Sequence, residues 1–238
     1  MGRRSSSVAA NLVKIDQGLC HETLKRRQRQ FRHLFPESLA LRTHRALSWL
    51  HRAEQEHDDH DARFIFLWIA FNSAYANEIQ DRARFSEKRL LLNFLHRLID
   101  SDTDQLLYNA VWHHFPESIR LLIGNRHVFQ PFWDYQNGRI GADDWQERFA
   151  RKNAAATRAL GRIDTRKVLA IVFDRLYVLR NQIVHGGATW SGTVNRSQVQ
   201  GGANILAFIV PIVILLMMEH PEKNWGCPCY PVVERNKR

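Results

Sequence analysis

The stretch RNQIVHGGATW, Arg180–Trp190, ends a long amphipathic segment that begins near Asp164. Within this segment apolar residues recur every three or four positions, which is the spacing of one buried helix face. The stripe consists of Leu169, Val172, Leu176, Leu179 and Ile183. Two glycines follow His185, and glycine suits the left-handed residue that closes the last turn of a helix. The sequence therefore predicts a helix that starts near Asp164 and ends at His185.

Three polar residues at the end of this helix suit the cleavage of a phosphodiester. A guanidinium binds phosphate through paired hydrogen bonds, and an imidazole transfers protons near neutral pH. Asn181 and His185 are four residues apart, so they lie together on the side opposite the apolar stripe, and Arg180 lies on the flank. We therefore take Arg180, Asn181 and His185 as the candidate catalytic residues.

The side of the helix opposite the stripe also carries Ile171, Asp174 and Val178. Apolar residues on this second side need a packing partner of their own. The partner is either another helix of the same domain or a second copy of the chain, because a twofold axis brings the same patch of two subunits together.

The motif resembles that of the HEPN superfamily, in which an arginine, four to six residues and a histidine lie on a late helix of a small helical bundle. The commonest form has asparagine directly after the arginine, as RNQIVH has. FLWIAFNSAYANE, Phe66–Glu78, is similar to an earlier helix of the Apea-like branch. The GGATW tail and the later apolar helix also fit that branch.

The resemblance implies a metal-independent endoribonuclease that works as a homodimer with its site between protomers; many such proteins are toxins or defence effectors. The RNA 2′-hydroxyl attacks the adjacent phosphorus and leaves a 2′,3′-cyclic phosphate. His185 moves the proton, Arg180 stabilises charge on the phosphoryl oxygens, and Asn181 holds the imidazole or the phosphate. Gly187 stands where some HEPN toxins carry tyrosine, which argues against the nucleotide-modified toxin subtype.

Two alternatives to a ribonuclease stay open. One is a non-catalytic HEPN-like module that binds RNA or a protein. The other is a helical structural subunit in which the spacing from Arg180 to His185 is a coincidence. Basicity does not separate them, because it serves binding and cutting alike.

Supporting roles are assigned to Asn72, Asp174 and Thr189. Asn72 lies within FIFLWIAFN, part of a helix expected over about Asp61–Gln80 that is apolar almost all round and therefore buried. A buried amide needs hydrogen-bond partners. Asn72 either bonds a neighbouring helix or faces the motif and orients His185 or RNA.

The chain has 34 Lys and Arg against 24 Asp and Glu, a formal charge of +10 that attracts anionic partners. We expect RNA as the partner, with an antitoxin or regulatory protein as a second. The densest basic run starts at residue 25 and is either a phosphate-binding surface or a solvated helix face. Its candidate RNA contacts are Lys25, Arg26, Arg27 and Arg29.

The expected fold is all-α: a HEPN-like helical bundle with extra helices and an aromatic-rich insertion. We divide the 238 residues into a basic N-terminal extension (1–36), the helical domain (37–220) and a C-terminal tail (221–238). The insertion covers about 118–141. Its aromatic residues either stack RNA bases or form a small core of their own.

We expect no metal and no cofactor. His57 and His60 lie among acidic residues, but their spacing is not that of a zinc site, and a helix start there needs an aspartate cap. The apolar run Asn204–Met218 is shorter than the about 20 residues of a bilayer span and contains Pro211, so a buried core or dimer helix is favoured over a membrane segment.

Three cysteines do not make a disulfide framework and are typical of a reducing compartment. The N-terminal residues show no secretory signal pattern. We therefore expect a cytoplasmic protein.

Overall fold

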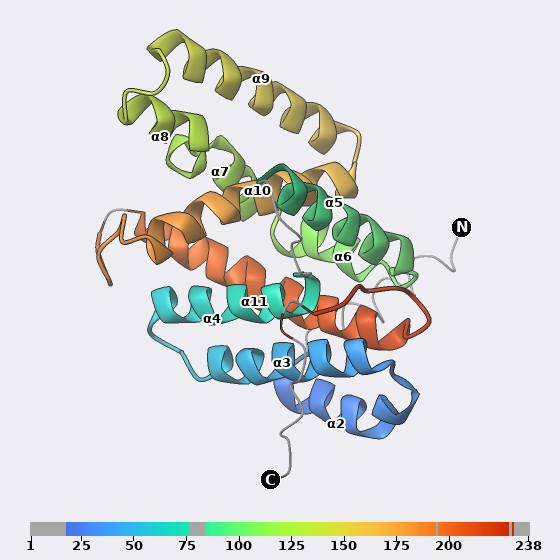
Figure 1. The fold of residues 1–238 in the computed structure, drawn as a ribbon. Coiled ribbons are helices and arrows are strands. Elements are labelled where there is room, and N and C mark those ends of the chain that lie inside the picture. The colour runs from blue at the N-terminus through green and yellow to red at the C-terminus, as the bar shows by residue number, and fades with distance from the viewer. Residues whose placement is uncertain (1–17, 77–83, 194, 229, 231–238) are drawn as a thin grey trace.

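The computed structural model describes residues 18–76, 84–193, 195–228 and 230. The described residues form ten α-helices and no strand, which confirms the all-α prediction. The helices are α2 (His21–Phe31), α3 (Glu37–Glu54), α4 (His60–Tyr75), α5 (Arg84–Ser101), α6 (Leu106–Asn109), α7 (Pro116–Gly124), α8 (Gln130–Gln136), α9 (Ala142–Gly161), α10 (Thr165–Val184) and α11 (Arg196–Glu219). Figure 1 shows α8 and α9 at one end of the bundle and α2 at the other, with α10 and α11 between them.

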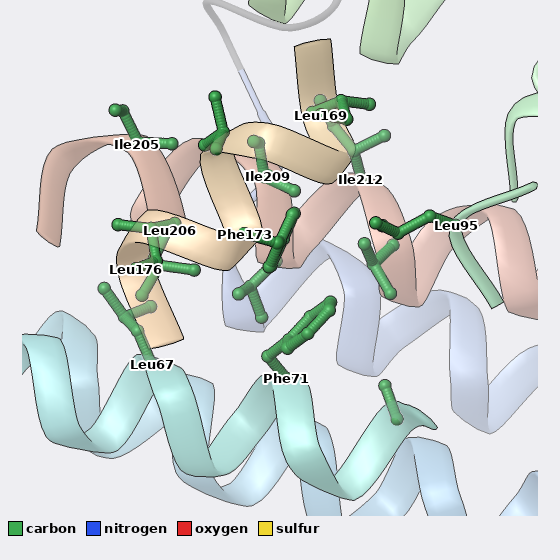
Figure 2. Packing of buried hydrophobic residues seen from close by; sticks show 14 of the residues in the cluster. Leu67, Phe71, Leu95, Leu169, Phe173, Leu176, Ile205, Leu206, Ile209 and Ile212 are labelled. Carbon is green, nitrogen blue, oxygen red and sulfur yellow. The ribbon is translucent and has the colours of Figure 1, made fainter. Parts of the chain in front are cut away.

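The core lies where α4, α10 and α11 meet (Figure 2). Phe71 of α4 stacks on Phe173 of α10 with ring centroids 4.5 Å apart. The predicted stripe of α10 faces this core: Leu169, Val172, Leu176 and Leu179 are buried, and Ile183 packs against them from the edge. Because this stripe is buried, the motif side chains Arg180, Asn181 and His185 lie on the other sides of α10, where they are half-buried or exposed.

Helix α11 begins at Arg196, eight residues before the expected start at Asn204. The preceding residues, RSQVQGGA, are polar and glycine-rich, so their local composition does not mark them as helical, but Gly202 packs against α4 and α10 and is buried. By length and apolar composition α11 can cross a membrane, and 72% of its most apolar window is buried inside the fold.

Helix α2 packs against α3 and α11, with Leu24 buried and the Gln28 amide donating to Thr43 Oγ1 at 3.1 Å. The expected domain boundary at residue 36 falls at Pro36, the N-cap of α3. Residues 1–17 of the expected extension and 231–238 of the expected tail lie outside the described residues, as do Asn77 and Glu78.

The aromatic residues expected to form an insertion pack into a small second core. Phe129, Phe132 and Trp145 are buried together, which confirms the mini-core interpretation of this stretch. Arg175 of α10 enters the same region: its guanidinium lies 4.5 Å from the centroid of the Phe129 ring. Arg175 therefore connects the motif helix to this second core, while Ile123 and Val128 of the insertion belong to the main core.

Candidate functional site

The motif helix ends in a Schellman turn. His185 is the C-cap, Gly186 has φ +70°, and the N–H of Gly187 donates to the Gln182 carbonyl at 2.7 Å. The N–H of Gly186 donates to the Ile183 carbonyl at 3.3 Å, the second bond of this turn. The predicted C-cap is confirmed, and it leaves the His185 side chain exposed at the surface.

Arg180 and Asn181 form one hydrogen-bonded unit beside this turn. Arg180 Nη1 donates to Asn181 Oδ1 at 2.9 Å, and the guanidinium lies 6.0 Å from the centroid of the Tyr177 ring. The backbone N–H of His185 donates to the Asn181 carbonyl at 3.0 Å. Asn181 thus orients the guanidinium through its side chain and the end of the helix through its backbone.

Arg180 is half-buried, so part of its side chain remains open to solvent. Its Nε is buried and has no hydrogen-bond partner within the described part of the chain, so an anion can approach only the terminal nitrogens. A guanidinium that is already held in place is suited to bind a phosphate oxygen, because little ordering remains to be done when the anion arrives. An exposed imidazole on the same helix end supplies a group that accepts or donates a proton.

Helix α4 runs antiparallel to α10, so its N-terminus lies beside the motif. Two ring contacts give this direction: Phe71 with Phe173, and Trp68 with Tyr177 at 6.1 Å between centroids. Asp59, the N-cap of α4, accepts from the Ala62 N–H at 2.9 Å, as the sequence predicted for an aspartate at this place.

The loop after the motif is tied to this start of α4. The Trp190 indole Nε1 donates to Asp59 Oδ2 at 2.8 Å, and the Ser191 N–H donates to Asp61 Oδ2 at 3.3 Å. Arg196 forms an ion pair with the same Asp61 carboxylate. The hydrogen bond from Ala62 is the main cause that lowers the pKa of Asp59, so this carboxylate stays an acceptor at neutral pH.

Gln182, which was not among the predicted site residues, joins three segments. Its Nε2 donates to the His127 carbonyl at 2.5 Å, and its Oε1 accepts from Asn195 Nδ2 at 3.1 Å. The motif is thereby connected both to the aromatic insertion and to the residue before α11. No local spacing marks this role, because the partners are 55 and 13 positions away.

Two of the expected supporting residues lie away from the motif. Asn72 follows Phe71, so it lies level with Phe173 and Asp174 on α10. Arg180 is six residues beyond Asp174, about 9 Å along the helix. Asn72 and Asp174 therefore lie at a similar height along the paired helices α4 and α10, away from the motif. Thr189, the third expected supporting residue, follows the motif turn directly and is exposed.

The apolar residues on the second side of α10 are covered within one chain. Val178 is 7% exposed, and Ile171 packs against the main core. Helices α5, α7 and α9 all contact α10 in addition to α4 and α11. These two residues therefore do not require a second copy, and a homodimer stays a prediction from the resemblance.

The basic residues of α2 lie far from the motif. Arg27 pairs with Glu219 at 2.9 Å, the last residue of α11, whereas Arg196, its first residue, lies beside the motif loop. A helix of 24 residues is about 36 Å long. The other candidates divide between intramolecular bonds and solvent: Arg26 pairs with Glu22, and Arg29 is exposed.

No group of three or more His, Cys, Asp or Glu placed to hold a metal occurs among the described residues. The acidic residues at the start of α4 instead cap that helix and hold the loop. No protein-family model, curated protein or solved structure matches the chain. Its function is therefore inferred from its own residues.

Proposed function

We propose that this protein is a metal-independent endoribonuclease of the HEPN type, of the Apea-like branch, that acts on RNA in the cytoplasm. The observation that carries the proposal is the end of α10. There His185 is exposed at the C-cap, directly before two glycines, and in the preceding turn Asn181 holds the Arg180 guanidinium through a hydrogen bond of 2.9 Å. A phosphate-binding cation and a proton-transfer group are the two parts that cleavage without a metal needs.

In the proposed reaction the 2′-oxygen forms a bond to phosphorus while the bond from phosphorus to the 5′-oxygen breaks. The 2′-hydroxyl loses a proton, the leaving oxygen gains one, and the products are a 2′,3′-cyclic phosphate and a 5′-hydroxyl. His185 serves as the base or the acid, and Arg180 neutralises the charge on the phosphoryl oxygens. One imidazole per chain cannot hold both positions at once, so a homodimer with two histidines at one site completes the reaction.

The proposal is tested with a labelled RNA and four variants of the full chain. His185→Ala and Arg180→Ala should each lower the cleavage rate by about 100-fold or more. His113→Ala and Arg120→Ala are matched controls, because both side chains are exposed and belong to other segments. Cleavage should continue in EDTA and yield a cyclic phosphate end.

Circular dichroism on each variant separates a lost site from a lost fold. His185 is exposed, so its truncation leaves no cavity in the core. A His185→Ala variant that cuts RNA at the wild-type rate would overturn the assignment of the site. Light scattering coupled to size exclusion tests the dimer, which a monomer at micromolar concentration would contradict.

One observation favours a second candidate, an RNA-binding module without catalysis. Asn181 accepts from Arg180, and within the described residues no hydrogen bond orients the His185 ring. A catalytic imidazole usually has a partner that fixes its tautomer. If the wild type binds RNA but does not cut it, and Arg180→Ala weakens the binding, this second function holds.

A further inference from the structure

Trp190 is a large apolar side chain that the fold leaves in solvent. It is 76% exposed, although its indole N–H is fixed by the hydrogen bond to Asp59 Oδ2 at 2.8 Å. The bond holds the ring by one edge only. A ring held in this way offers its face to a ligand and loses little freedom on binding.

The segment around Trp190 is also fixed. The N–H of Gly192 donates to the Thr189 carbonyl at 3.1 Å, and the Ser191 N–H is held by Asp61. A Cβ at position 192 would lie 2.5 Å from Thr189 Oγ1 and 3.0 Å from the Thr189 carbonyl oxygen, so glycine permits this tight turn. The exposed ring is therefore part of a built loop.

The ring follows the proposed cleavage site closely along the chain. Trp190 comes five positions after His185, and an extended chain of that length spans at most about 18 Å. Of the carboxylates at the start of α4, Asp61 pairs with Arg196, and Asp59 caps the helix and accepts from the indole N–H. An RNA strand whose phosphate lies at Arg180 thus has an aromatic face within a few nucleotides.

We propose that Trp190 is a stacking platform for an unpaired base, which makes single-stranded RNA the substrate class of this site. The inference rests on the proposed function for its location beside the scissile phosphate. An aromatic face binds any base that is free of the helix stack, and a base inside a duplex is not free. The polar neighbours Thr189 and Ser191 favour a single base as the occupant over an extended apolar protein surface.

The test measures binding and cleavage separately, with the full chain. Fluorescence anisotropy uses a 2′-O-methyl RNA, which cannot be cut through the 2′-oxygen, as a single strand and as a duplex. Trp190→Ala should weaken single-strand binding by about 5- to 150-fold and leave duplex binding unchanged. Trp190→Phe keeps an aromatic face and should stay close to the wild type. Tyr230→Ala is the control, since Tyr230 is 80% exposed in another segment.

The outcomes distinguish this inference from the proposed function. Equal single-strand binding by Trp190→Ala and the wild type overturns the stacking role, whether or not the protein cuts RNA. So does an equal loss for both RNA forms, or a change in oligomeric state that identifies the ring as a protein contact. A wild type that never cuts RNA but shows the predicted pattern overturns the nuclease and supports the stacking role.

Discussion

Gly202 lies where α11 packs against α4 and α10, and its replacement by alanine is expected to destabilise the fold. A Cβ at this position would meet Phe64 Cε2 at 3.0 Å and the Cδ2 atoms of Leu176 and Leu179 at 3.1 Å. These distances are shorter than ordinary van der Waals contacts, so three core side chains must shift. The preceding residue, Gly201, has no atom within 4 Å of such a Cβ.

The adjacent glycines separate packing from helix propensity. Alanine is about 1 kcal/mol more favourable than glycine in a helix interior, and both positions gain this term. Overpacking of a well-filled core costs about 1–3 kcal/mol, and Gly202→Ala alone incurs it. We therefore expect Gly201→Ala to be more stable than the wild type and Gly202→Ala to fall about 1–3 kcal/mol below Gly201→Ala.

Urea unfolding of the two variants and the wild type, followed by circular dichroism, measures this difference. The midpoint of Gly202→Ala should lie below that of Gly201→Ala with a similar slope. Equal midpoints for the two variants would refute the close packing of α11 on α10. Since Leu176 and Leu179 belong to the motif helix, such a result would also question how that helix is positioned.

Two further predictions concern buried or partly buried cations. Arg175 is 2% exposed, burial lowers its pKa to about 10, and its Nε and Nη1 lack hydrogen-bond partners within the described chain. Methionine fills a similar volume without a buried charge, so Arg175→Met should unfold at the same or a higher urea concentration than the wild type. Arg175→Ala leaves a cavity and should lower the free energy of unfolding by about 2–4 kcal/mol. The pKa of His21 is lowered, chiefly by burial and then by His51, so the unfolded chain binds more protons than the folded chain just below pH 6.5. The free energy of unfolding therefore decreases as the pH is lowered through this range. His21→Gln should make this decrease smaller, which urea titrations on either side of pH 6.5 would measure.

The spacing of apolar residues predicted the helix α10, whose apolar residues face the main core. It did not predict the first turns of α11, where the packing of a glycine stabilises the helix. The stripe of α10 faces that core, and its predicted end at His185 is confirmed. The first turns of α11 contain polar residues and two glycines, so no local pattern marks them as helical. They are helical because Gly202 fits against side chains of α4 and α10, which only the folded chain brings together.

The candidate site was predictable only in its local part. Arg180, Asn181 and His185 lie within six residues, and the helical spacing placed them correctly at one helix end. The bond from Trp190 to Asp59 joins residues 131 positions apart, and the sequence shows Asp59 only as a helix cap. Long-range pairs of this kind depend on the antiparallel course of α4 and α10, which periodicity does not specify.

Part of the excess positive charge that the sequence places on α2 is engaged in ion pairs within the chain. Arg27 is engaged with Glu219 and Arg26 with Glu22, so α2 offers fewer free cations than its sequence contains. It also lies about 36 Å along α11 from the motif loop, a distance that about ten base pairs of a duplex cover. Under the proposed function, a short RNA bound at Arg180 would therefore not reach α2. Long-range attraction by the +10 charge can still raise the rate of encounter with an anion, while under the proposed function the contacts that position the phosphate would come from the end of α10 and its loop.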